Sequence, residues 1–394
     1  MSTENDTLDR RFSKKHFPRT NNKNVLEFVF EKDPNMFLRK NKIIIKGYIE
    51  LSEDFVVKNG WVSKLFTQLD VQLDCQSVST CRNYFYADYI QKIGNFNQPF
   101  VETGFVSEGY YDNDNCDADA ITPSTLEHRR DGYHYTTSQQ KKTYVYEFVL
   151  IPSLGFLADP LPLLKDCELK LNFDRAPAST AIMSSNDIEA PYLEIKDCYA
   201  TTEWVSSPGL RDYFQAIDYN PLVYKYDEVE VLAKPLPMNT TNLRLDNLRG
   251  GNIPSYIFSA IIPTDAMNGD LAKSSTNFAC HNVAEMNITL NGHSVSGYPI
   301  EIKNESDTNA LFQFNDALGR TYNNKCCGGL KKINFKTNFI WSHHFEAEET
   351  SQGWIGMDIK LSKPLTTSHT MIVWIIYPMS ISIDKFHQIE KITL

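Results

Sequence analysis

Short runs in which apolar and polar residues alternate recur along nearly the whole chain, each bounded by Gly, Pro, Asn or Asp. Alternation with a period of two places the apolar side chains on one face of a β-strand, and the bounding residues are typical of turns. Phe and Tyr, which favour strands, are abundant. The sequence therefore predicts an all-β protein, with strands near residues 25–31, 42–51, 65–74, 143–151, 168–173, 192–205, 225–233, 255–262, 285–290, 335–344, 354–361, 370–377 and 380–384.

Helices are expected only as short insertions between strands. Tyr84, Phe85, Tyr89 and Ile93 are spaced to share one face of a helix over residues 83–93. A second short helix is predicted at residues 210–217, and turn-forming sequences lie on both sides of it.

The turns around this second helix mark the expected domain boundary. We place a linker at residues 206–222, a first domain at residues 24–205, a second at residues 223–394 and a polar arm at residues 1–23. Each domain then holds roughly six to eight strands, the number that a jelly roll needs. The predicted architecture is two β-sandwiches side by side.

Residues 66–78 and 283–295 share one pattern of apolar positions, as an internal repeat would. Each segment alternates and then reaches a polar turn. The sequence therefore predicts that the two domains arose by duplication. The matching pairs are Leu69 with Met286, Val71 with Ile288, Leu73 with Leu290, and Val78 with Val295.

Charge and composition exclude several functions. The net charge of −10 would repel a nucleic-acid backbone. The polar N-terminus lacks the apolar stretch of a signal peptide, and no apolar run approaches the ~20 residues of a membrane span. The eight cysteines show no zinc-ligand spacing and are interpreted as reduced thiols. We expect a protein that is soluble when synthesised inside the cell.

Two long polar insertions, at residues 104–142 and 303–329, are expected to form exposed loops. The carboxylates at residues 112–119 are spaced partly as in a calcium-binding loop. However, Pro123 stands at the position where such a loop requires a bidentate Glu. We interpret this run as a solvated acidic loop.

The remaining motifs do not make a catalytic centre. His343 and His344 are adjacent in a predicted strand, so they should point to opposite faces instead of sharing a metal with Glu346. The Cys326–Cys327 pair is interpreted as a flexible turn, and the sequence from Arg249 as a turn before a strand. We therefore expect no catalytic, cofactor-binding or metal-binding residues, and no enzymatic activity.

The N-terminal arm has a positive character in an otherwise acidic chain. Two readings remain open: a disordered tail, or an arm that orders against a neighbouring subunit, a cement protein, nucleic acid or an anionic membrane. The residues proposed to carry the second role are Arg10, Arg11, Lys14, Lys15 and Arg19.

Several segments of the sequence resemble segments of one known protein family. Residues 5–17, 25–35 and 84–97 are similar to the capsid-like proteins of Polintons and adintoviruses, and residues 251–263 resemble the second jelly roll of that family. Residues 146–173 also resemble major capsid proteins of larger DNA viruses. The resemblance covers nearly the whole chain. This chain is short for a double jelly roll, which implies that the exposed loops at the top of the two jelly rolls are short.

The resemblance implies two eight-stranded jelly rolls in a subunit that forms homotrimers, which act as pseudo-hexagonal capsomers of an icosahedral virion. Neighbouring capsomers, penton proteins and minor or cement proteins are the implied partners. Two alternatives stay open: a carbohydrate-binding or glycan-processing protein on paired jelly rolls, and a domesticated transposon-derived capsid protein that no longer assembles virions.

Overall fold

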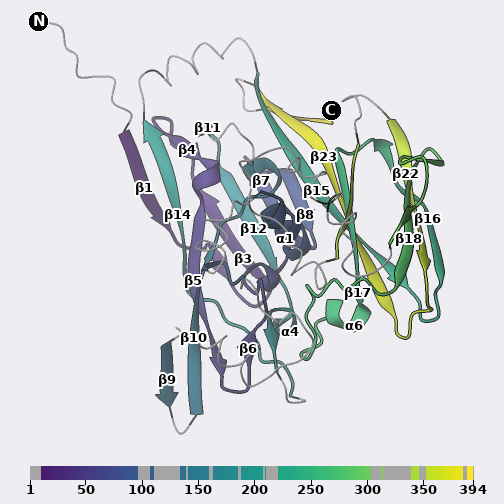
Figure 1. Ribbon diagram of the computed structural model, residues 1–394. Coiled ribbons are helices and arrows are strands. Elements are labelled where there is room, and N and C mark those ends of the chain that lie inside the picture. The colour runs from purple at the N-terminus through teal and green to yellow at the C-terminus, as the bar shows by residue number, and fades with distance from the viewer. Residues whose placement is uncertain are drawn as a thin grey trace, which may run out of the picture.

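The computed structural model describes residues 10–95, 107–110, 134–138, 141–158, 163–184, 188–206, 209, 221–302, 312, 314, 339–345, 352–384 and 388–393. These residues form two antiparallel β-sandwiches side by side, with few helices (Figure 1). No helix in this part of the chain is long and apolar enough to cross a membrane. The all-β prediction is confirmed.

The first sandwich has two facing sheets. One contains β1 (Arg10–His16), β14 (Lys196–Ser206), β5 (Ile44–Ser52), β10 (Lys141–Leu150) and β9 (His134–Ser138), with β4 (Phe37–Arg39) and β11 (Leu163–Lys165) alongside. The other contains β2 (Thr20–Asn21), β3 (Val25–Phe30), β12 (Leu169–Arg175), β7 (Phe66–Leu73) and β8 (Gln76–Arg82).

The second sandwich repeats this arrangement. One sheet contains β15 (Leu222–Leu236), β23 (His369–Ile383), β17 (Tyr256–Pro263), β21 (Trp341–His344) and β24 (Ile389–Thr393). The other contains β16 (Asn242–Asn252), β22 (Gln352–Leu361), β18 (Val283–Leu290), β19 (His293–Ser294) and β20 (Ile300–Glu301).

The two sandwiches share one strand order. In the first, β1, β14, β5 and β10 face β3, β12, β7 and β8, and in the second β15, β23, β17 and β21 face β16, β22, β18 and β19. Within the described residues, each set comprises eight strands, and its first strand pairs with its last. This is the Greek-key order of a jelly roll, so the predicted double jelly roll is confirmed.

The two segments with matching apolar patterns occupy equivalent places. β7 and β18 each lead into a two-residue hairpin turn in which both residues have positive φ: Asp74 (43°) and Cys75 (68°), and Asn291 (53°) and Gly292 (82°). This is the conformation of the type I′ turns that suit the twist of a hairpin. The equivalence is what a duplication would produce, although the duplication itself stays a prediction.

The structure corrects three of the expected boundaries. β16, at Asn242–Asn252, was not predicted, and the sequence from Arg249 belongs to this strand instead of a turn because its backbone pairs with β22 after a bulge. The strands predicted at 370–377 and 380–384 are one strand, β23. Pro378 is tolerated there because it falls between the pairings with β17 and β24, where no partner requires an N–H.

The linker predicted at residues 206–222 is only partly described. Ser206 ends β14 and Leu222 begins β15, so the linker has at most the residues between them. The helix predicted at 210–217 lies outside the described residues.

The sheet that contains β17 and β23 is buried on both faces. Ile257, Val373 and Ile375 point into the core of the second sandwich, whereas Phe258 and Trp374 belong to a core cluster that is continuous with the first sandwich. A strand buried on both faces carries a nearly unbroken apolar run, as residues 371–376 do. The two sandwiches therefore share an apolar interface.

Helix α1 (Tyr84–Asn95) confirms the predicted helix but not its single apolar face. Tyr84, Tyr86, Tyr89 and Lys92 are all buried, because the helix lies between the two sandwiches (Figure 1). A helix covered on all sides has no solvent face to mark in its sequence.

The remaining short elements are η1 (Lys40–Lys42), η2 (Ser63–Leu65), η4 (Gly155–Ala158), α4 (Ala178–Ala181), α6 (Thr264–Met267), β6 (Val56–Val57) and β13 (Ile182–Met183).

Candidate assembly surfaces

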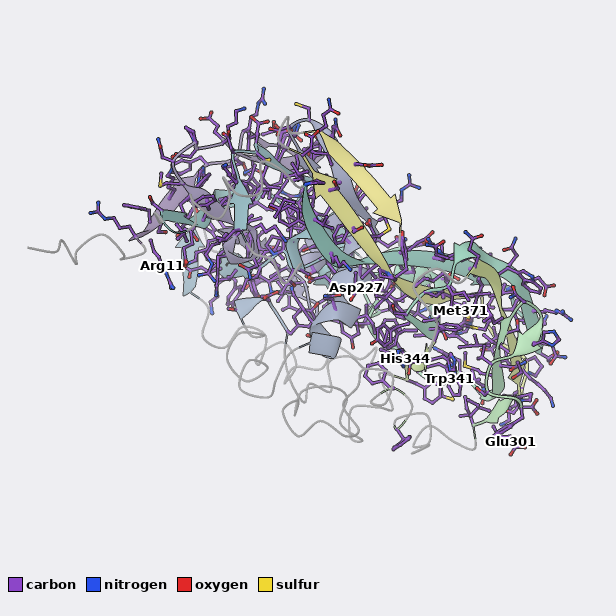
Figure 2. The ribbon with its side chains drawn as sticks, turned by 90° about the horizontal axis from the view of Figure 1, so that it is seen from above. Arg11, Asp227, Glu301, Trp341, His344 and Met371 are labelled. Carbon is purple, nitrogen blue, oxygen red and sulfur yellow. The ribbon has the colours of Figure 1, made fainter. Side chains whose placement is uncertain are left out.

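Strand β1 lies at the edge of the first sandwich. Its residues pair with β14 from Arg10 with Ser206 to His16 with Ala200, and among the described strands its other edge is unpaired. Figure 2 shows Arg11 at one end of the molecule and Glu301, from the second sandwich, at the other. An open strand edge offers unpaired backbone groups to an extended segment of another chain.

Part of the arm expected at residues 1–23 is thus β1, the first strand of the first jelly roll. The side-chain pattern could not reveal this, since β1 is held chiefly by backbone bonds at a sheet edge and most of its side chains are exposed. Nothing is described for residues 1–9.

Three of the five candidate assembly residues contact their own sandwich. Lys14 lies 4.3 Å from the ring centre of Trp204 and 3.2 Å from the Asp33 carboxylate. Lys15 lies 3.7 Å from the ring centre of Tyr199.

Arg19 completes this set, with its guanidinium 3.7 Å from the Glu27 carboxylate. Arg10 and Arg11 are exposed at the start of β1. Phe12 and Phe17, 43% and 69% exposed, add apolar surface to the same strand region. The β1 edge thus combines exposed cations with two exposed rings.

The outer face of the sheet that contains β1 is polar. Lys196 lies 2.7 Å from Glu50, and Arg39 lies 2.6 Å from Glu203, in ion pairs between adjacent strands. The equivalent sheet of the second sandwich carries apolar residues on its corresponding face, where it packs against the first sandwich. Topologically equivalent sheets thus have opposite surface chemistry.

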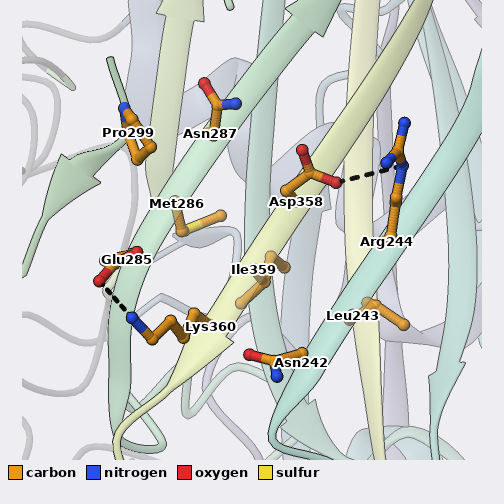
Figure 3. A pocket seen from close by; sticks show the side chains of 10 residues that line it. All are labelled: Asn242, Leu243, Arg244, Glu285, Met286, Asn287, Pro299, Asp358, Ile359 and Lys360. Carbon is orange, nitrogen blue, oxygen red and sulfur yellow. Dashed lines mark hydrogen bonds and ion pairs between the residues drawn. The ribbon is translucent and has the colours of Figure 1, made fainter. Parts of the chain in front are cut away.

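A shallow hollow of about 360 Å³ lies on the sheet formed by β16, β22 and β18 (Figure 3). Its charged side chains already pair with one another: Lys360 lies 2.7 Å from Glu285, and Arg244 lies 3.8 Å from Asp358. The hollow contains no converging pair of unpaired carboxylates that would suggest glycan hydrolysis.

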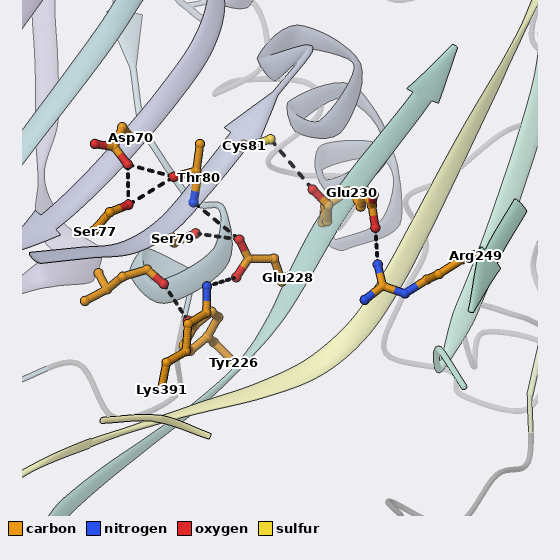
Figure 4. A network of polar contacts seen from close by, with 12 residues as sticks. Asp70, Ser77, Ser79, Thr80, Cys81, Tyr226, Glu228, Glu230, Arg249 and Lys391 are labelled. Carbon is orange, nitrogen blue, oxygen red and sulfur yellow. Dashed lines mark hydrogen bonds and ion pairs between the residues drawn. The ribbon is translucent and has the colours of Figure 1, made fainter. Parts of the chain in front are cut away.

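A polar network joins the two sandwiches around Glu228 of β15 (Figure 4). The Glu228 carboxylate accepts hydrogen bonds from the Thr80 backbone N–H at 3.3 Å and the Ser79 hydroxyl at 3.4 Å. Lys391 of β24 lies 3.8 Å away. Burial raises the pKa of Glu228, and these partners oppose the rise.

A further hydrogen bond crosses the same interface, from the Tyr226 hydroxyl to the Val78 carbonyl at 2.9 Å. These contacts link strands far apart in the sequence. No sequence signal identified them.

The two adjacent histidines have different surroundings. His343 packs against Phe345 and His344 stacks on Tyr256, so the two rings have different neighbours at the end of β21. Among the described residues no group of His, Cys, Asp and Glu side chains could hold a metal ion. Glu346, the acidic run at 112–119 and the Cys326–Cys327 pair lie outside the described residues.

Comparison with known sequences gives a partial match. No family model matches the chain. An uncharacterized protein of Caenorhabditis elegans is 22% identical over 206 residues, which cover 51% of this chain. The chain spans about half of that relative, since the match covers 49% of it.

Comparison with solved structures covers nearly the whole chain. The Sputnik virophage structure matches with a TM-score of 0.65 at 9% identity, over 100% of this chain and 90% of that one. The PBCV-1 virus capsid matches with a TM-score of 0.62 at 9% identity, over 99% and 98%. The mavirus major capsid protein matches with a TM-score of 0.54 at 10% identity, over 100% and 93%.

Proposed function

We propose that this chain, whose fold is the double jelly roll of its structural neighbours, is a major capsid protein. It forms homotrimers that act as pseudo-hexagonal capsomers of an icosahedral virion shell. Its implied relatives are the Polinton and adintovirus capsid proteins, and its implied location is the virion. The structural neighbours are shell proteins and not enzymes.

The observation that carries the proposal is the apolar, two-sided burial of the sheet that contains β17 and β23. It fixes two similar sandwiches side by side in one rigid subunit. Three such subunits around a threefold axis would place six similar sandwiches in a ring, because repeated head-to-tail contacts form a closed ring when the rotation between subunits closes. Obligate interfaces of this kind bury roughly 2,000 Å² or more.

The polar outer face of the first sandwich, next to the β1 edge, is our candidate for contact with the next subunit. It is topologically equivalent to the face that the second sandwich uses inside the chain. Its charged side chains suit a contact that forms after folding, because a charged surface keeps the free subunit soluble until it meets a partner. Penton proteins, cement proteins and neighbouring capsomers are the further partners we propose.

The test is the mass of the purified full chain in solution. Native mass spectrometry or light scattering should give about 136 kDa, three times the chain mass of 45.2 kDa. Negative-stain electron microscopy should then show hexagonal capsomers or shells. A monomer at all concentrations up to those used for assembly would contradict the proposal.

One alternative has a specific observation in its favour. The match to a nematode protein suits a transposon-derived capsid protein that persists in a host genome. Such a protein would still trimerise but would form no shell, so electron microscopy of the trimer separates the two proposals. The glycan-binding alternative predicts binding on a glycan array, which a shell protein does not require.

A further inference from the structure

Three charged side chains meet in the interior beside α1. The Lys92 ammonium lies 2.6 Å from the Asp88 carboxylate, one helical turn earlier, and also contacts the carboxylate of Glu108. All three side chains are fully buried. The Ser63 hydroxyl donates a second hydrogen bond to Asp88.

The surroundings of this triad are tightly closed. Glu108 precedes Gly109, which has a φ of 78°, and a Cβ at Gly109 would collide with the Trp61 ring. The Gly60 N–H donates to the Gly109 carbonyl at 2.7 Å, and Lys92 lies 5.7 Å from the ring centre of Tyr110. Aromatic rings and a fixed backbone therefore hold the three groups together away from water.

The charges in this cavity do not balance when all three groups are ionised. Two carboxylates and one ammonium leave an excess negative charge, which is costly in a desolvated site. One oxygen of Asp88 and one of Glu108 have no hydrogen-bond partner among the described residues. Burial raises the pKa of Glu108 to about 7. A single bound proton makes the triad neutral overall.

We propose that Lys92 and Glu108 form an intramolecular isopeptide bond. The Lys92 ammonium first passes a proton to the Asp88 carboxylate. The neutral amine then attacks the carbonyl carbon of the protonated Glu108 carboxyl, a C–N bond forms, and the Glu108 hydroxyl leaves as water with the second amine proton. The products are an amide, a neutral Asp88 carboxyl and one water molecule, so no charge remains in the cavity.

The geometry assigns different roles to the two acids. Asp88 is held by Ser63 and by Lys92 on its own helix, which suits a proton acceptor. Glu108 comes from a separate segment, and its second oxygen has no partner among the described residues. The bond would tie α1 to the segment at residues 107–110.

The reaction is expected to be slow. Burial lowers the pKa of Lys92, but the two carboxylates outweigh this effect and raise it, so the amine is the minor form. Proximity compensates, because an amine and a carboxyl held in contact react at a high effective concentration.

The experiment is the intact mass of the full-length chain, denatured after purification and incubation at neutral pH. The expected mass is lower than the sequence mass by one water. Trypsin should then fail to cut after Lys92, which leaves residues 83–129 as one peptide. Chymotryptic cleavage of that peptide should release two fragments joined through Lys92 and Glu108.

Two controls make the result specific. Lys360 and Glu285 present the same groups 2.7 Å apart but exposed to water, so their peptides should not be joined. Lys92→Arg keeps the positive charge but should show the full sequence mass, with circular dichroism confirming that it folds. A wild-type chain that keeps its full sequence mass and is cut normally after Lys92 would overturn the proposal. This outcome would leave the capsid proposal untouched, since trimer mass is measured independently.

Discussion

The indole N–H of Trp374 donates a hydrogen bond to the backbone carbonyl of Tyr86 at 2.8 Å, which joins two residues 288 positions apart in the chain. The two rings also meet edge to face, 6.2 Å between centres. Trp374 belongs to β23 of the second sandwich, whereas Tyr86 belongs to α1. The contact therefore lies across the interface between the sandwiches.

Replacement of Trp374 by Ala should destabilise both sandwiches together. Loss of a fully buried Trp side chain leaves a cavity and removes a hydrogen bond, at a cost of about 3–5 kcal/mol in the free energy of unfolding. Chemical denaturation followed by circular dichroism should show a single transition at lower denaturant concentration. Trp354→Ala is the matched control, since Trp354 is 36% exposed and its loss should cost much less.

Two separate unfolding transitions in the wild-type chain, only one of them shifted in Trp374→Ala, would contradict this prediction. The interface would then be too weak to couple the sandwiches.

Charge reversal at the β1 edge should affect assembly but not folding. Arg10→Glu combined with Arg11→Glu changes two exposed side chains, so the free energy of unfolding should shift by less than about 0.5 kcal/mol. Contacts between subunits should weaken, which light scattering during assembly would report. Lys225→Glu with Lys363→Glu makes the same change in net charge at other exposed positions. Equal assembly of both double variants would count against a role for β1.

Glu228 should make the interface more stable at mildly acidic pH. Burial raises its pKa in the folded chain, so the folded state holds the proton more tightly than the unfolded state, and stability falls as the pH rises through the folded pKa. Glu228→Gln keeps a hydrogen-bond acceptor for Thr80, so its free energy of unfolding at neutral pH should lie within about 1 kcal/mol of the wild-type value. The advantage of wild type over this variant should grow as the pH falls towards 5. A difference that is independent of pH would argue against the buried carboxylate.

His281 should make the folded chain less stable at acidic pH, which is the opposite of the effect of Glu228. Burial and the nearby His369, 4.4 Å away between ring centres, lower the pKa of His281 from 6.5 to about 4. The unfolded chain takes up this proton first, so stability is lost as the pH falls from about 6.5 towards 4, by an amount on the order of 3 kcal/mol.

The variant His281→Asn should lose less stability over that range. Asn tolerates the positive φ of 47° at this position. The exposed His293→Asn serves as the control for removal of a histidine. Identical pH profiles for wild type and His281→Asn would show that another group titrates.

The strands with one buried face were predictable from the sequence. β7 alternates between buried and partly exposed residues, and its counterpart β18 does so nearly as well, because each packs on a single core. β16 was missed because most of its residues are exposed and two glycines interrupt the pattern. β1 was missed because its side chains contribute little to the pairing.

The interior polar sites were not predictable, because their partners meet only in three dimensions. Lys92 and Asp88 are recognisable as a pair on a helix, but Glu108 reaches them from within the insertion predicted at residues 104–142. The carboxylate of Glu228 meets Ser79 and Thr80 from a strand that is 148 residues away from Thr80. Alternation of apolar residues carries no information about such encounters.

The sheet buried on both faces also constrains how the protein can be synthesised. During translation, α1 and the first sandwich emerge from the ribosome long before β23 is made. The apolar surface around Tyr86 therefore stays exposed to water until β23 has been translated. Exposed surface of this kind invites aggregation of nascent chains. Cells that make large amounts of this protein would therefore need chaperones that shield the first half until translation of β23 is complete.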